Sequence, residues 1–380
     1  MMFYFVGVII TFFLAFILLS KRNKSDADRI LFFWLLTIGI HLSFYYLSIN
    51  GQQFNFPFLL GIDLSLPLIH GPFLYLYTAS VTNQIKGWNI SILHFLPVLI
   101  SLIALIPFFR LPNEDKILVY KNEGLGHETL MTVTTIAIIL SGIIYVIWSL
   151  VLLKNHRQNI LKQFSYSEKI NLYWLRYLIL GIGVIWFFVI FGTEEMTFLS
   201  VVLFVIFIGY FGINQVGVFT QKKSFIVHDN IQVAITTNSE DGNLEFESEI
   251  IEEKKTQKYE KSGLTDETAK DIHDVLSQKM EEEKFFVNPE LTLVELAQFI
   301  DVHPNNLSQV INTYEEKNFY DYINSKRIEM FKEIVESPES KKYTILSLAF
   351  DCGFNSKSSF NKYFKKETNL TPSEYIKTIK

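Results

Sequence analysis

The sequence predicts an all-α protein in two parts: a seven-helix transmembrane domain, then a helical domain with two helix-turn-helix units joined by a linker helix. Three observations lead to this prediction. Apolar stretches of about 20 residues recur as far as residue 217. From Gln221 onward charged residues are frequent and apolar residues fall at helical spacing. In that second part, a short helix, a tight turn and a helix with a polar outer face are predicted twice.

Seven stretches are long and apolar enough to be transmembrane helices, since a bilayer core requires about 20 apolar residues per helix. They are residues 2–20, 30–49, 57–81, 89–109, 129–153, 172–191 and 196–217. The first is unlike a signal peptide, because no positive segment precedes it and KRNK follows it in place of a small-residue cleavage site. We therefore expect residues 1–217 to form one membrane domain.

Lysine and arginine are distributed unevenly between the two sets of loops that join these helices. Eleven follow helices one, three, five and seven, against three in the opposite set. Positively charged loops stay in the cytoplasm, so the N-terminus is expected outside and, with an odd number of helices, the C-terminal part inside. We expect a multi-pass protein of the bacterial inner (cytoplasmic) membrane, with the lipid bilayer as one partner.

Motifs of catalytic and metal sites are missing from the sequence. The single cysteine, Cys352, excludes an intrachain disulfide and a CxxC metal site, and its apolar neighbours indicate a core position. Neither HExxH, GxSxG nor a P-loop occurs. The sequence therefore predicts no enzyme, no cofactor and no metal.

A few ionisable residues lie within the expected spans, namely Asp63, His41, His70 and His94. Such groups often mark binding or proton-relay sites, which makes Asp63 and His70 candidates for a ligand site in the membrane. The alternative is structural, because Asp63 lies near the outer end of its helix and the histidines lack metal-site spacing. Gly and Pro in HGPFLYLYT indicate close helix packing or a kink.

Residues 218–263 are polar and of mixed charge, which predicts a cytoplasmic tether. A weak alternation at Ile231, Val233 and Ile235 is compatible with one short strand. The helical domain then covers residues 264–380.

Capping signals place the helices of this domain. Thr265 caps a helix that extends to about Lys284, and Thr292 with Glu295 has the spacing of a capping box. Pro304 suits the first turn of the next helix. That helix places Leu307, Val310, Ile311 and Tyr314 on one face and Asn305, Asn306, Ser308, Gln309 and Asn312 on or beside the other. Amide side chains can bind adenine in the major groove. A polar surface helix without a DNA partner would explain the same residues.

The pattern then repeats. Thr344 caps a short helix, Gly353 makes the turn, and Ser356 opens a helix that buries Phe360 and Phe364. Its outer face carries Lys357, Ser358, Asn361, Lys362, Lys365 and Lys366. Residues 341–380 contain eight lysines and three acidic residues, which gives this segment a charge of +5. Basic residues alone would indicate a solvated face, but beside a repeated helix-turn-helix they favour DNA.

Residues 319–337 between the two units predict one unbroken helix with Ile323, Met330 and Ile334 inward. Its length of about 28 Å can hold the reading helices about one DNA turn apart. Thr371, Pro372 and Glu374 form another capping box that opens a last helix.

The segments LVELAQFIDVHPNNLSQVIN, NFYDYINSKRIE and ILSLAFDCGFNSKSSFNKYFKKETNLTPSEYI resemble the AraC family of bacterial transcription regulators, over roughly residues 258–380. The membrane part is similar to the multi-spanning region found on some AraC-type proteins of Bacteroidetes. The resemblance implies base contacts from Asn305, Ser308, Gln309, Lys357, Ser358, Asn361 and Lys362. We expect phosphate contacts from Asn306, Asn312, Lys365 and Lys366.

The sequence departs from that family in the first unit. Asp301 and Glu316 stand where glycine is usual, and His303 replaces a capping Ser or Thr. Residues 284–340 contain five basic and ten acidic residues. We therefore expect the first helix-turn-helix unit to bind phosphate weakly.

The expected function is that of a membrane-anchored one-component transcription regulator, expected to be a homodimer, that binds double-stranded promoter DNA in response to an unknown small-molecule or membrane signal. Two alternatives remain open at this point. The tail of a membrane receptor or transporter-like protein could dock protein partners, or proteolysis could release the tail as a soluble factor.

Overall fold

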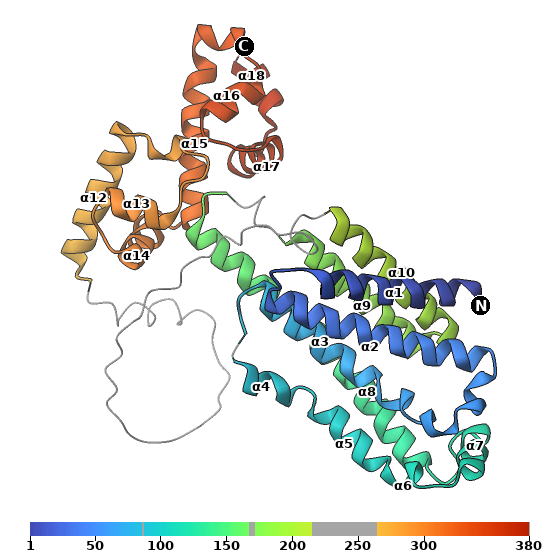
Figure 1. The fold of residues 1–380 in the computed structure, drawn as a ribbon. Coiled ribbons are helices and arrows are strands. Elements are labelled where there is room, and N and C mark those ends of the chain that lie inside the picture. The colour runs from blue at the N-terminus through green and yellow to red at the C-terminus, as the bar shows by residue number, and fades with distance from the viewer. Residues whose placement is uncertain (86, 167–171, 215–263, 380) are drawn as a thin grey trace. The chain divides into compact units, whose positions relative to one another are not determined.

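The chain divides into two compact units in a computed structural model that describes residues 1–85, 87–166, 172–214 and 264–379. The first unit contains Met1–His156 and Leu172–Ile226, and the second contains Arg157–Asn171 and Val227–Lys380. Every regular element in the described ranges is a helix (Figure 1). The expected tether at 218–263, with its possible strand, lies outside the described residues.

The first unit consists of α-helices with short 3₁₀ turns between α2 and α3. Its helices are α1 (Met2–Ser20), α2 (Asp26–Ile49), α3 (Pro67–Val81), α4 (Trp88–Leu93), α5 (Leu96–Ala104), α6 (Ile106–Phe109), α7 (Asn113–Lys121), α8 (Glu128–Gln163), α9 (Tyr173–Phe191) and α10 (Glu194–Asn214). The core of this unit is formed mainly by α1, α2, α3, α9 and α10, with Trp34, Leu35 and Leu42 of α2 fully buried.

Five of these helices are long and apolar enough to cross a membrane, namely α1, α2, α8, α9 and α10. The 3₁₀ turns at Pro57–Ser65 together with α3 make a sixth candidate, which is bent by 46°. The expected span at 89–109 is interrupted as α4, α5 and α6. Pro97 and Pro107 lie in the first turns of α5 and α6, where a proline lacks the N–H that would continue the preceding helix. The count of seven is therefore not confirmed.

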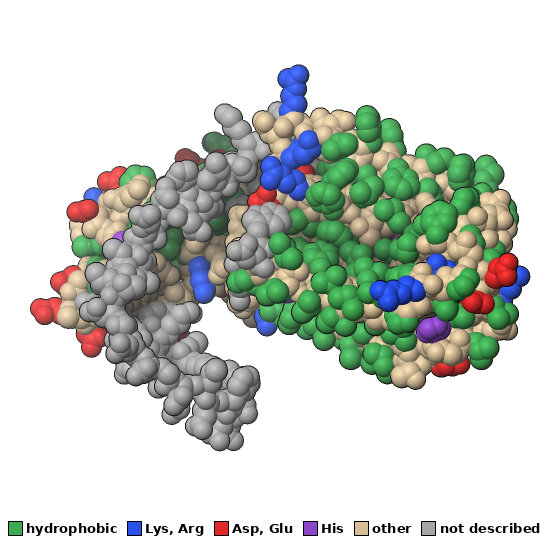
Figure 2. Space-filling model, turned by 60° about the horizontal axis from the view of Figure 1, so that its bottom comes forward, with side chains coloured by type: hydrophobic (Ala, Val, Ile, Leu, Met, Phe, Trp, Pro, Cys, Tyr) green, Lys and Arg blue, Asp and Glu red, His purple; other side chains and the backbone are tan. Residues whose placement is uncertain are grey.

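Large apolar side chains cover much of the outer surface of the first unit (Figure 2). Phe13, Phe16 and Phe187 are examples, at 60%, 63% and 56% exposure. A soluble protein rarely exposes so continuous an apolar surface, whereas a lipid-facing one requires it. Inside, a Cβ on Gly71 would lie 2.6 Å from the Tyr145 ring, so the glycine of the HGPFLYLYT segment serves close helix packing.

The second unit is built around one long helix, α15. Its helices are α12 (Asp266–Glu282), α13 (Leu293–Phe299), α14 (Pro304–Tyr314), α15 (Phe319–Glu336), α16 (Ile345–Asp351), α17 (Lys357–Thr368) and α18 (Pro372–Ile379), with a 3₁₀ turn, η4, at Phe285–Val287. The first half of α15 packs into a core with α12–α14, and the second half packs into a separate core with α16–α18. We call α13 with α14 the first helix pair and α16 with α17 the second helix pair.

Local sequence signals account for the starts of these helices. Thr292 and Glu295 form the expected capping box, with N–H to O distances of 3.2 and 2.8 Å. Thr344 accepts from Ser347 N at 3.1 Å, and Ser356 accepts from Ser359 N at 3.0 Å. His303, which was noted as a departure, also caps its helix, because its Nδ1 accepts from Asn305 N at 3.2 Å.

Candidate nucleic-acid interface

Helix α14 has one buried and one polar face. Leu307, Val310 and Ile311 are fully buried against the first core, which fixes the orientation of the helix. Of the residues expected to contact bases, Asn305 is exposed, while Ser308 and Gln309 are half-buried. All three can be reached from solvent on the face opposite the core.

Helix α17 is anchored in the same way by aromatic residues. Phe360, Tyr363 and Phe364 are buried, and the Phe360 and Phe364 rings pack on Phe331 of α15 with centroid distances of 4.8 and 5.6 Å. The remaining candidate residues are all exposed on its outer face, namely Lys357, Ser358, Asn361, Lys362, Lys365 and Lys366. These lysines give the helix a surface suited to an anionic partner.

Two of the four residues expected to contact phosphate already have protein partners. Lys366 Nζ lies 2.7 Å from Asp321 Oδ1 of α15, and Asn312 Nδ2 donates to Ser308 O at 2.6 Å. A phosphate would have to compete with these bonds. Asn306 is half-buried and Lys365 is exposed.

The turns inside the two pairs differ in a way that the sequence indicated. Asp301 has φ +56° and Glu316, after α14, has φ +52°, so both adopt the left-handed conformation in which glycine is usual. In the second pair the corresponding residue is Gly353, with φ +92°. A Cβ there would lie 2.6 Å from Phe286 O and 2.7 Å from Val287 O. Gly353 is therefore required both by its conformation and by close approach to η4.

Arg327 of α15 is the most deeply buried charged side chain of the second unit, at 1% exposure. Its guanidinium donates to Phe286 O and Asn288 O, both at 2.7 Å, and lies 5.8 Å from the centroid of the Phe354 ring. Burial lowers the pKa of Arg327 to about 10, so it remains charged at neutral pH. Buried arginines are retained when hydrogen bonds replace the lost water, as these carbonyls do.

A segment from the end of α8 completes this site. Arg327 also donates to Ser165 O and to Ser165 Oγ, both at 3.2 Å, and Asn324 Nδ2 donates to Ser165 O at 3.1 Å. Ser165 N donates to Leu291 O at 3.1 Å, and Phe164 forms an isolated antiparallel bridge with Thr292, the cap of α13. Ser165 is 1% exposed. Residues 164–165 are therefore an integral part of the second unit.

Sequence reasoning missed this arrangement. The spacing of Ile323, Arg327 and Phe331, four residues apart, placed the arginine on the inward face of α15, and that signal could have been used. Nothing local in the sequence marks Ser165 as its partner.

The ligand-site candidates Asp63 and His70 both line one cavity of the first unit. His70 Nε2 lies 3.1 Å from His41 Nδ1, so these two histidines form a pair although their spacing in the sequence is not that of a metal site. In the described part of the chain, no cluster of three or more His, Cys, Asp or Glu has the arrangement of a metal site.

Comparison with known proteins identifies the second unit more closely. Residues 296–378 match the helix-turn-helix domain family, which covers both helix pairs from Leu296 onward. The chain is 32% identical over 85 residues to the uncharacterized HTH-type transcriptional regulator YijO and 31% identical over 87 residues to the uncharacterized HTH-type transcriptional regulator YpdC, both of Escherichia coli (strain K12). Each match covers 22% of this chain and 29% of the relative. No solved structure matches.

Proposed function

We propose that this protein is a membrane-anchored, one-component transcription regulator, in which the two helix pairs are helix-turn-helix units of the AraC type. The observation that carries the proposal is the helix-turn-helix match over 296–378 together with a repeated design, in which α14 and α17 each bury one face and expose a polar one. A DNA-binding regulator needs no catalytic site.

In this proposal α14 and α17 enter successive major grooves. Asn305, Ser308 and Gln309 read bases from α14, and Lys357, Ser358, Asn361 and Lys362 read bases from α17. Lys365 and Asn306 bind phosphate, while Asn312 and Lys366 contribute once DNA displaces their protein partners. Helix α15 has 18 residues, about 27 Å at 1.5 Å each, which suits a separation close to one DNA turn of about 34 Å.

The contacts of Ser165 support a particular orientation in the membrane. This residue follows α8 and bonds to Arg327, so the loop after α8 and the DNA-binding unit lie on the same side of the membrane. Two spans, α9 and α10, separate them in sequence, and an even number returns the chain to the side it left. The C-terminal end of α8 carries Lys154, Arg157 and Lys162, and positive charge at the end of a span favours the cytoplasmic side of a bacterial inner membrane. A seventh span at 88–109, interrupted at its prolines, would put the N-terminus outside.

The regulator acts as a homodimer in this proposal. The first helix pair has more acidic than basic neighbours, so one copy would bind DNA weakly at physiological salt. Pairing of two copies raises the affinity by holding the second DNA-binding unit at a high local concentration.

The proposal is tested with the full chain in lipid nanodiscs, incubated with fragments of bacterial genomic DNA. We expect enrichment of specific fragments and, in footprints of those fragments, two protected tracts about one DNA turn apart per copy. Replacing Asn305 and Asn361 by alanine should abolish the enrichment, whereas Gln278→Ala on α12 should preserve it. A chain that retains no fragment, or that captures proteins and no DNA, contradicts the proposal.

A further inference from the structure

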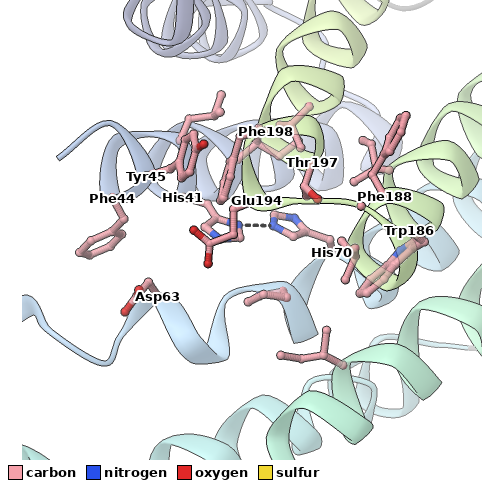
Figure 3. A pocket seen from close by; sticks show the side chains of 18 of the residues that line it. His41, Phe44, Tyr45, Asp63, His70, Trp186, Phe188, Glu194, Thr197 and Phe198 are labelled. Atoms are coloured by element: carbon pink, nitrogen blue, oxygen red, sulfur yellow. Dashed lines mark hydrogen bonds between the residues drawn. The ribbon is translucent and has the colours of Figure 1, made fainter. Parts of the chain in front are cut away.

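The first unit contains a cavity of about 450 Å³, a size typical of small-molecule sites (Figure 3). Side chains of α2, α3, α9 and α10 form most of its wall, and Tyr120 of α7 also lines it. Because α2 and α3 are distant in sequence from α9 and α10, the cavity is a property of the folded unit.

The wall of this cavity is aromatic and acidic. Asp63 and Glu194 are the ionisable acids that line it, and no lysine or arginine is among its lining residues in the described ranges. Aromatic rings supply much of the remaining surface, from Trp34, Phe44, Tyr45, Trp186, Phe188 and Phe198. Figure 3 shows Asp63, Glu194 and the His41–His70 pair among the side chains that line the cavity. A cation gains from both features, by charge attraction and by contact with ring faces, whereas an anion would be repelled.

Two buried polar atoms of the wall have no hydrogen-bond partner within the described part of the chain. One is Nε1 of Trp34, a residue with 0% exposure, and the other is Oδ1 of Asp63. The second oxygen of Asp63 accepts from Tyr120 OH at 2.5 Å, which fixes the carboxylate. A buried donor or acceptor left without a partner lowers stability, so both atoms point to a ligand that would complete their hydrogen bonds.

The His41–His70 pair makes a second fixed polar element of the wall. Their rings are parallel, with an interplanar angle of 9° and a centroid distance of 5.4 Å, and one imidazole donates to the other. Because this hydrogen bond requires one neutral acceptor nitrogen, the pair carries at most one positive charge.

We propose that the cavity binds a small organic ammonium compound with an aromatic or aliphatic body and one hydrogen-bond acceptor. The ammonium group donates to Asp63 Oδ1, the body packs between the aromatic rings, and the acceptor receives the indole N–H of Trp34. Glu194 adds negative charge. This proposal concerns the first unit alone and stands whether or not the second unit binds DNA.

The test uses the purified full chain and three probes that share one phenol ring: tyramine, tyrosol and 4-hydroxyphenylacetate. At neutral pH they carry a positive, a zero and a negative charge on the side chain, and each offers the phenol oxygen to Trp34. Binding is followed by isothermal titration calorimetry and by quenching of tryptophan fluorescence. We expect tyramine to bind at least tenfold more tightly than tyrosol, and 4-hydroxyphenylacetate not to bind.

Variants separate the charge contact from general packing. Asp63→Asn should weaken tyramine binding at least tenfold and leave tyrosol binding unchanged, which also shows that the cavity is intact. Glu114→Gln, which neutralises an exposed acid of α7 outside the cavity, should change neither. Equal binding of all three probes, no binding of tyramine, or an Asp63→Asn chain that binds tyramine normally would overturn the proposal.

Discussion

The two helix pairs share one design but differ in what surrounds them. The first pair turns at a strained Asp301 in an acidic environment, and Phe164 bridges to the cap of its first helix. The second pair turns at Gly353 in a basic environment, and its core is formed by aromatic residues. The two helix pairs therefore repeat the same arrangement of helices but differ in their turn residue, their local charge and their packing. The second pair carries the exposed positive charge, and the first is held in position by contacts within the protein.

The largest loss of stability is expected for Arg327→Met. The substitution leaves Phe286 O, Asn288 O and Ser165 O without their charged donor, at a cost of about 4 kcal/mol, since losing one side of a buried charged network typically costs about 3–5 kcal/mol. In hydrogen exchange of the full chain, amides of residues 285–300 should lose most of their protection. Amides around Phe360–Phe364 should keep theirs, because they belong to the other core.

The matched control is Lys326→Met, on the same helix. Its side chain forms an ion pair with Glu329 at 3.0 Å on the surface of the helix. Lys326→Met should change the amide hydrogen exchange of the second unit little, because surface ion pairs contribute little to stability. Equal loss of protection in both helix pairs would show that they are one cooperative unit and break the comparison.

Gly353→Ala is expected to cost about 3 kcal/mol, because a non-glycine residue at φ +92° adds strain and its Cβ would lie 2.6 Å from Phe286 O. Pulse proteolysis of the full chain in urea should show cleavage in the second unit at a lower urea concentration. The control Asp301→Ala keeps a Cβ where one is already accommodated, so its effect should be under about 1 kcal/mol. If both substitutions cost the same, the close approach to η4 is not what fixes the second turn.

Lys362→Ala with Lys365→Ala tests the electrostatic half of the comparison. Lys365 is a proposed phosphate contact and Lys362 a proposed base contact. One lost phosphate contact lowers the magnitude of the slope of log K against log salt by about 0.9, so this slope should fall by about 0.9 and the affinity by tenfold or more. Fluorescence anisotropy with a bound DNA fragment at several salt concentrations measures this. Removing Lys270 and Lys279 of α12, outside both pairs, should leave the slope unchanged, and an unchanged slope in the α17 variant would refute the phosphate role.

Asp301→Gly is expected to change the stability least. Glycine relieves the strain of the left-handed conformation but loses more backbone entropy on folding, so the free energy of unfolding should rise by no more than about 1 kcal/mol. The same pulse proteolysis measures it. A loss of stability would mean that the Asp301 side chain itself contributes to the turn.

Much of the second unit was predictable because its signals are local. Caps such as Thr292 and Ser356 lie within three residues of the amides they bind, and the inward faces of α14 and α17 follow from helical spacing. The contact of Ser165 with Arg327 joins residues 162 positions apart, and His41 meets His70 across 29 positions. Such pairings depend on tertiary packing, which periodicity does not encode.

The interrupted helix at 89–109 was missed for a different reason. Its average composition is that of a membrane span, and the average conceals the effect of Pro97 and Pro107 on helix continuity. The base and phosphate contacts remain predictions, since side-chain exposure alone does not distinguish a DNA surface from a solvated one.

Helix α8 runs without a break for 36 residues, about 54 Å at 1.5 Å per residue, which is longer than the roughly 30 Å of a bilayer core. Its last turns and Ser165 belong to the same compact unit as α13 and α15. The second unit is therefore assembled from two separate stretches of the chain, Arg157–Asn171 and Val227–Lys380. A fragment that begins at residue 264 would lack Phe164 and Ser165, so its behaviour in isolation would be that of a domain without the partners of Thr292 and Arg327.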